Sequence, residues 1–166
     1  RMELTPDELA GVVDVVGPLT REELRRACGE LAFKQGEDVE AATVEEWVES
    51  ALASYHLIAV ADEAGRTTER GGDGPLLVVG PAAFPALPDG AEDLPHILDL
   101  PERSIAREVM GEAAESQFRT DAADAVRRGD QSRIRTLLDV SYELEAWGPV
   151  DRSTARGRLD EATHPN

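Results

Sequence analysis

Lysine is nearly missing from this sequence. Only one of its 17 basic residues is a lysine, Lys34, whereas Asp and Glu number 34 and give a formal net charge of -17. A surface of short, strongly hydrated carboxylates stays hydrated and self-repelling where salt reduces the Debye length to about 3 Å. The composition therefore predicts a protein of a halophile. A GC-rich mesophilic genome is the alternative, although it accounts for arginine in place of lysine and not for the excess of carboxylates.

Cysteine and long apolar runs are also scarce. The single cysteine, Cys28, excludes an internal disulfide, and its position on an apolar helical face predicts a buried side chain. No run approaches the roughly 18 apolar residues of a membrane-spanning helix, and the amino terminus lacks the basic-then-apolar pattern of a secretory signal. We therefore expect a cytoplasmic protein without a membrane segment. The length suits one domain or two small ones.

Motifs of common enzymes are absent as well. The sequence has no GxxxxGK[ST] phosphate loop, no GxGxxG at the start of a helix and no GxSxG elbow. The histidines His56, His96 and His164 do not have metal-ligand spacing. Neighbouring carboxylates such as Glu22 and Glu23 arise by composition in so acidic a chain. The sequence predicts no catalytic residue, no metal and no cofactor, and hence a protein that is not an enzyme.

Three capping boxes predict three helices in the first third of the chain. Each has a threonine followed three residues later by a glutamate: Thr5 and Glu8, Thr20 and Glu23, Thr43 and Glu46. Such a pair satisfies amide groups that the first helical turn leaves without partners. Apolar residues at helical spacing follow each box, and Trp47 is predicted at the centre of the shared core.

Two apolar runs after the third helix predict strands at 57–60 and 76–79, joined as a hairpin by a glycine-rich, charged loop.

Five prolines between 81 and 101 predict a semi-rigid connector and a domain boundary. Beyond it, 102–114 and 117–128 have helical patterns and can form one helix with Gly111 inside. Asp130 is placed to cap a further helix.

These elements predict a mostly α fold with a small β-hairpin, in the α+β class. We expect a winged-helix-like domain at 4–80, a proline-rich connector at 81–101, a helical carboxy-terminal subdomain at 102–150 and a polar tail at 151–166.

The order of three helices and a hairpin resembles the winged helix-turn-helix superfamily, and the chain as a whole is similar to an uncharacterised protein family of haloarchaea. The resemblance rests on Thr20-Arg21-Glu22-Glu23-Leu24, on the third helix leading into Leu57-Ile58-Ala59-Val60, and on the acidic, lysine-poor composition. It covers about residues 4 to 80. It implies a scaffold and not an activity.

The third helix of a DNA-binding winged helix enters the major groove. Here that helix and its approach have six carboxylates and no basic residue between 37 and 55. DNA binding depends on Lys or Arg at phosphates, so we expect a non-catalytic binding or regulatory module that acts through a protein partner or a second copy of itself. The alternative is a DNA-binding transcription regulator. The candidate contacts with nucleic acid or another anion are Arg66, Arg70, Arg127, Arg128, Arg133 and Arg135.

Overall fold

The computed structural model describes residues 2–61, 74–147 and 159–163. The chain divides into two compact units, Arg1–Ile105 and Ala106–Asn166. Within the described residues, helices predominate and the strands form one antiparallel hairpin, as the α+β prediction requires.

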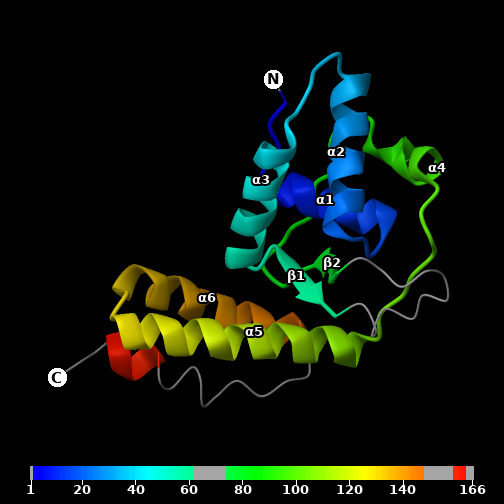
Figure 1. Cartoon of the computed structure of the whole chain (residues 1–166). Helices are drawn as coiled ribbons and strands as arrows, with labels where there is room; N and C mark the ends of the chain where they lie inside the picture. Colours follow the sequence, from blue (N-terminus) through cyan, green and yellow to red (C-terminus); the bar gives the residue numbers. More distant parts are fainter. Residues whose placement is uncertain (1, 62–73, 148–158, 164–166) are drawn as a thin grey trace. The chain divides into compact units, whose positions relative to one another are not determined.

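The first unit begins with helices α1 (Pro6–Val16), α2 (Arg21–Lys34) and α3 (Ala41–Ala53) (Figure 1). Both arms of the capping box are formed at α1 and at α2: each threonine hydroxyl accepts from the glutamate amide, and each glutamate carboxylate accepts from the threonine amide. These two predicted helix starts are confirmed. The local hydrogen bonds explain them, because they satisfy donors that the helix itself cannot.

The third predicted cap is wrong. Helix α3 begins at Ala41, and Glu40 is its N-cap residue, without a side-chain capping bond. Thr43 therefore lies inside the first turn, where its amide donates to the Glu40 carbonyl at 3.0 Å. Alanine has the highest helix propensity, so Ala41 and Ala42 extend the helix beyond the threonine.

Strands β1 (Leu57–Val60) and β2 (Leu76–Val79) pair antiparallel, with Leu57 opposite Val79 and Val60 opposite Leu76. Leu19, between α1 and α2, forms an isolated bridge with Leu77 of β2. Its amide and carbonyl both bond to Leu77, at 3.3 and 2.7 Å. These two bonds attach the hairpin to the segment between α1 and α2. The hairpin is also attached to α3, because β1 follows α3 directly in the chain.

The core of the first unit lies between the three helices and the hairpin. Trp47 is only partly buried, so its predicted place at the centre is wrong; Val44, Val48 and Ala51 are the buried residues of α3. An indole is large enough that a position at the edge of a core suits it better than complete enclosure. Tyr55 is the largest fully buried side chain among the described residues of this unit.

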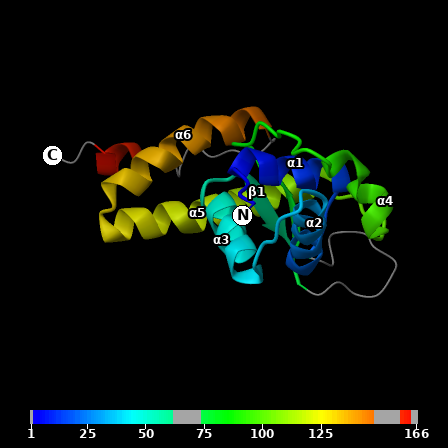
Figure 2. The same ribbon diagram turned by 90° about the horizontal axis from the view of Figure 1, so that it is seen from above.

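The proline-rich segment is more than a connector. It contains a 3-10 turn (η2, Ala91–Asp93) and helix α4 (Leu94–Leu98), and Figures 1 and 2 show α4 beside α2. Leu94 and Leu98 are buried in the core of the first unit. Pro95 does not prevent the helix because it occupies the first turn, where its missing amide is not needed. The segment thus belongs to the first unit, which ends at Ile105.

The second unit consists mainly of two long helices, α5 (Arg107–Arg128) and α6 (Gln131–Trp147), which lie side by side (Figure 1). The two helical patterns predicted before Gly129 form one helix with Gly111 buried inside it, but it begins at Arg107 and not at 102. Asp130 caps α6 as predicted, since its Oδ1 accepts from the amide of Arg133 at 3.0 Å. The predicted polar tail falls mostly outside the described residues; 159–163 are helical, with Leu159 buried.

Candidate functional site

The arginines predicted to contact nucleic acid or another anion fall in two places. Arg66 and Arg70 lie outside the described residues. The other four lie at the turn between α5 and α6: Arg127, Arg128, Arg133 and Arg135.

Aspartates of α5 already neutralise three of these four guanidinium groups. Asp124 forms an ion pair with Arg127 and another with Arg128, whose Nε lies 3.5 Å from its Oδ2. Arg133 Nη2 lies 3.3 Å from Asp121 Oδ2. An anion would have to compete with these carboxylates for each of the three arginines.

The turn itself has the features of a helix end. Gly129 adopts the left-handed conformation, with φ at 65°, and the amides of Gly129 and Asp130 return to carbonyls of α5. Arg127 and Arg128, in the last turn, favour the negative end of the helix dipole. Arg135 is exposed and, unlike the other three, forms no ion pair with a described residue.

Helix α3 has the acidic face that the sequence predicts. Arg21 of α2 reaches across to it, with Nη1 2.7 Å from Glu45 Oε1 and 2.8 Å from Glu49 Oε2. The charge of Arg21 is therefore used inside the molecule, and Glu46 of the same helix stays exposed. This arrangement presents carboxylates and not cations on the face of α3.

A serine, a histidine and an aspartate meet where α3 ends, a grouping that the sequence analysis missed. Ser54 Oγ lies 2.7 Å from His56 Nδ1, and His56 Nε2 lies 3.5 Å from Asp7 Oδ1 of α1. The same Asp7 oxygen accepts from the amide of Phe84 at 2.9 Å. Asp7 and Phe84 are 77 residues apart, so no local pattern could have indicated this network.

The surroundings of Ser54 do not suit a nucleophile. Its hydroxyl is within hydrogen-bond distance of two carbonyls of the last turn of α3, at 2.9 Å from Ser50 and 3.3 Å from Ala51. A hydroxyl that donates to a carbonyl cannot pass its proton to His56, and the negative end of a helix dipole opposes a developing oxyanion. The network is therefore better suited to holding α1, the end of α3 and the segment at Phe84 together.

The backbone beside this network is unusual. Tyr55 has a φ of 63°, a conformation that glycine adopts easily and bulky residues rarely do. Its carbonyl accepts from Ala82 at 2.9 Å, and a Cβ at Gly80 would come within 2.3 Å of the same oxygen. The strained residue thus fixes where the chain runs after β2.

That chain lies directly on α1 between 84 and 88. The amide of Ala86 donates to the Asp7 carbonyl at 2.9 Å, and a Cβ added to Gly11 would be 2.0 Å from the Ala86 carbonyl oxygen. Pro88 is buried at the end of the segment. We call residues 84–88 the arch. Its backbone is held at Phe84 and Ala86 by the bonds to Asp7, and at its far end Pro88 is buried. The side chains of Phe84 and Leu87 project from it and are 78% and 52% exposed.

Other large apolar side chains are exposed on the helices. Phe33, in the last turn of α2, is 79% exposed, and Ile97 of α4 is 43% exposed. Single exposed apolar residues are normal on soluble proteins, whereas two on one fixed segment are less so.

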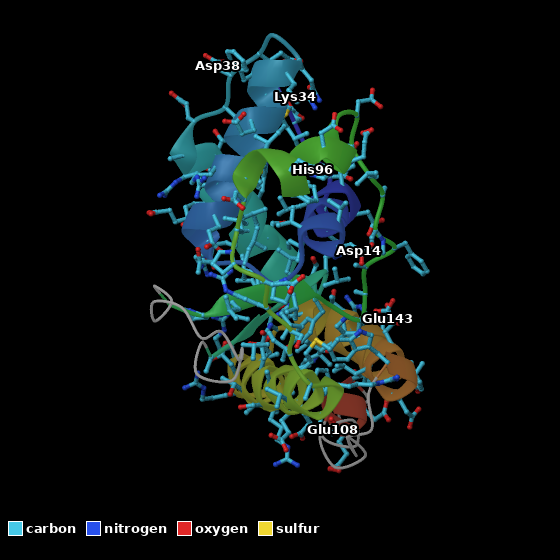
Figure 3. All side chains as sticks on the ribbon, turned by 90° about the vertical axis from the view of Figure 1, so that its right-hand side faces the viewer. Asp14, Lys34, Asp38, His96, Glu108 and Glu143 are labelled. Atoms are coloured by element: carbon cyan, nitrogen blue, oxygen red, sulfur yellow. The ribbon has the colours of Figure 1, made fainter. Side chains whose placement is uncertain are left out.

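Figure 3 shows Lys34 at the end of α2 and His96 on α4. Lys34 donates to the Gly90 carbonyl and to Asp93, and its hydrogen bond lowers the pKa of Asp93.

The described residues contain no group of three or more His, Cys, Asp or Glu side chains that could hold a metal ion. Cys28 is fully buried as predicted, and its burial raises the pKa of the thiol to about 12. No helix in the described part of the chain is long and apolar enough to cross a membrane.

Two features define the class of this protein: an α+β unit of helices with one hairpin, and a second unit built on a helix pair. The chain belongs to a family of unknown function, DUF7109, whose model matches residues 7–164. Neither a search of curated proteins nor a search of solved structures found a match.

Proposed function

We propose that this chain is a non-catalytic, cytoplasmic binding module of a halophile, with a winged-helix-like first unit, and that it acts through a protein partner. The observation that supports a protein partner best is the exposure of large apolar side chains on a carboxylate-rich surface, above all Phe84 and Leu87 on the arch. An apolar side chain gains from contact with another protein and gains nothing from contact with phosphate.

The topology of the first unit supports the winged-helix proposal. Three helices precede the hairpin, and the bridge between Leu19 and Leu77 attaches the hairpin to the segment between the first two helices. A wing needs such an attachment if it is to keep a fixed position beside the helices. Arg66 and Arg70, the arginines predicted in the wing, lie outside the described residues.

The charges on α3 favour a protein partner over duplex DNA. The helix that would enter the major groove has Glu45, Glu46 and Glu49, and Arg21 is already bound to two of them. Carboxylates at this position would repel phosphates, and no counterions would be released on binding.

Fluorescence titration against duplex DNA tests this choice at 0.1 M and at multimolar KCl. We expect no saturable binding at either concentration. Saturable binding that weakens when Arg66 and Arg70 are changed to alanine would overturn the proposal in favour of a DNA-binding regulator. The same substitutions at Arg107 and Arg119, which are not among the predicted anion contacts, serve as the matched control for loss of two positive charges.

A further inference from the structure

We infer that the arch, residues 84–88, is the element that engages the partner, and that it inserts Phe84 and Leu87 into an apolar groove edged by Lys or Arg on another protein. This inference rests on the proposed function, because it names the surface and the partner chemistry of the same binding module.

The arch is fixed before binding. Asp7 accepts from the amides of Phe84 and Ala86 through its side chain and its carbonyl, at 2.9 Å in each case. Gly11 lets the Ala86 carbonyl rest on α1 without an intervening side chain. Prolines at 85 and 88 restrict the backbone further. A segment that is already ordered loses little conformational entropy when it binds, so its apolar contacts contribute more fully to affinity.

The side chains that project from the arch have the chemistry of an inserted ligand. Phe84 and Leu87 are exposed although the backbone that carries them is held against the protein. A proline-containing segment with apolar side chains is a common ligand for apolar grooves. Aromatic anchors that enter such grooves account for much of the binding energy of an interface.

The charge around the arch indicates which kind of partner fits it. The arch lies on α1, and the stretches 2–20 and 80–102 contain nine carboxylates and neither lysine nor arginine. Lys34 of α2 pairs with one of the nine, Asp93. Asp14, labelled on α1 in Figure 3, and Asp89, next to Pro88, are both exposed. Two copies of the chain joined through this face would oppose like charges, whereas a groove with a basic rim would complement them.

The test begins with the full chain carrying a benzophenone amino acid in place of Phe84, irradiated in extract of its own host. The matched probe carries the same group in place of Phe33, an equally exposed phenylalanine. The protein crosslinked from position 84 and not from position 33 is identified, purified and titrated against the unmodified chain and its variants. Circular dichroism confirms that each variant is folded.

We expect Phe84→Ala and Leu87→Ala to weaken binding about tenfold or more, and Phe33→Ala to change it less than twofold. Asp7→Ala should weaken binding more than Asp14→Ala, since both remove one charge of α1 but only Asp7 holds the arch. Reversal of two negative charges beside the arch, by Asp89→Lys with Glu92→Lys, should weaken binding several-fold.

The outcomes separate this inference from the proposed function. A purified partner whose affinity depends on Phe33 and not on Phe84 or Leu87 overturns the arch and leaves the binding module standing. Unchanged affinity after Asp89→Lys with Glu92→Lys overturns the inference that the partner's groove has a basic rim. Crosslinks that join only copies of this chain would overturn the inference of a different protein as partner and would show self-association instead. Crosslinking to no protein from either position overturns both the inference and the proposed function.

Discussion

Arg103 and Glu23 form a two-pronged ion pair although they are 80 residues apart, with Nη1 2.6 Å from Oε1 and Nη2 3.0 Å from Oε2. Nη1 also donates to the Pro18 carbonyl at 3.1 Å. Glu23 in turn accepts from the amide of Thr20, as the glutamate of the α2 capping box. One carboxylate therefore both begins α2 and fixes the last residues of the first unit.

Removal of the arginine should cost the first unit much of its stability. The two side chains are only 4% and 16% exposed, and loss of one partner from such a pair leaves a charge with poor hydration. We expect Arg103→Ala to lower the free energy of unfolding by about 3 kcal/mol in denaturant titration. Arg25→Ala is the control, because Arg25 pairs with Glu22 at an exposed site over 3.8 Å. It should cost less than about 0.5 kcal/mol, and equal losses in the two variants would contradict the prediction.

The same pair should make stability depend on acid. Burial alone would raise the pKa of Glu23, but hydrogen bonds from Arg103 and from the Thr20 amide outweigh it and hold the pKa below its ordinary range. A group whose pKa is lower in the folded state contributes stability above its unfolded pKa, about 4.3 for glutamate, and loses it as the pH falls through the folded value. The difference in stability between the wild type and Glu23→Gln should thus be full at pH 6 and shrink below about pH 4.3. A difference that stays constant down to pH 3 would show that the carboxylate is not responsible. Glu22→Gln should have little effect throughout.

The hydrogen bonds between residues close in sequence could be predicted from the sequence, and those between distant residues could not. Thr5 with Glu8 and Thr20 with Glu23 are three residues apart, so their hydrogen bonds follow from helix geometry alone. The bonds from Phe84 to Asp7 and from Arg103 to Glu23 join residues that only the complete fold brings together. An acidic chain offers too many carboxylates for sequence to indicate which one an arginine binds.

The same distinction explains the errors in the fold. The prolines between 81 and 101 predicted a connector, because sequence shows where proline interrupts regular structure and not where Leu94 and Leu98 enter a core. Thr43 looks like a third cap, yet two alanines before it begin the helix one turn earlier. In both cases packing and propensity outweigh a motif that is only locally favourable.

Glycine at position 11 should be required by the arch, while glycine at position 29 should not be required at all. A Cβ at Gly11 would overlap the Ala86 carbonyl, whereas one at Gly29 would meet nothing within 4 Å. We expect Gly11→Ala to lower the free energy of unfolding by about 1–3 kcal/mol, because the arch or α1 must move. Gly29→Ala lies in α2 at an exposed position and should raise it by about 0.5–1 kcal/mol. Chemical denaturation of both variants decides, and a Gly11→Ala protein as stable as the wild type would show that Ala86 does not rest on α1.

Cys28 should report unfolding and little else. Its thiol is fully buried and has a pKa of about 12, so at pH 8 both access and the thiolate fraction are very low. We expect a disulfide reagent to react with the native protein about 10³-fold more slowly than with the protein in concentrated urea. The single cysteine makes the amplitude one thiol per chain. Rapid reaction under native conditions would mean that α2 separates readily from the core.

The excess of carboxylates should make stability depend on salt. With 34 acids against 17 bases, the charges of the chain repel one another in dilute buffer, and screening reduces that repulsion more in the folded state, where the charges are closer. We expect the midpoint of thermal unfolding to rise by roughly 5 °C or more between 0.1 M and 3 M KCl. Sucrose at matched osmolality is the control, because it stabilises folded proteins by exclusion from their surface without screening charge. If sucrose raises the midpoint of unfolding as much as KCl does, the effect comes from exclusion and not from screening. A midpoint that does not change with KCl would remove the physical reason for proposing a halophilic host.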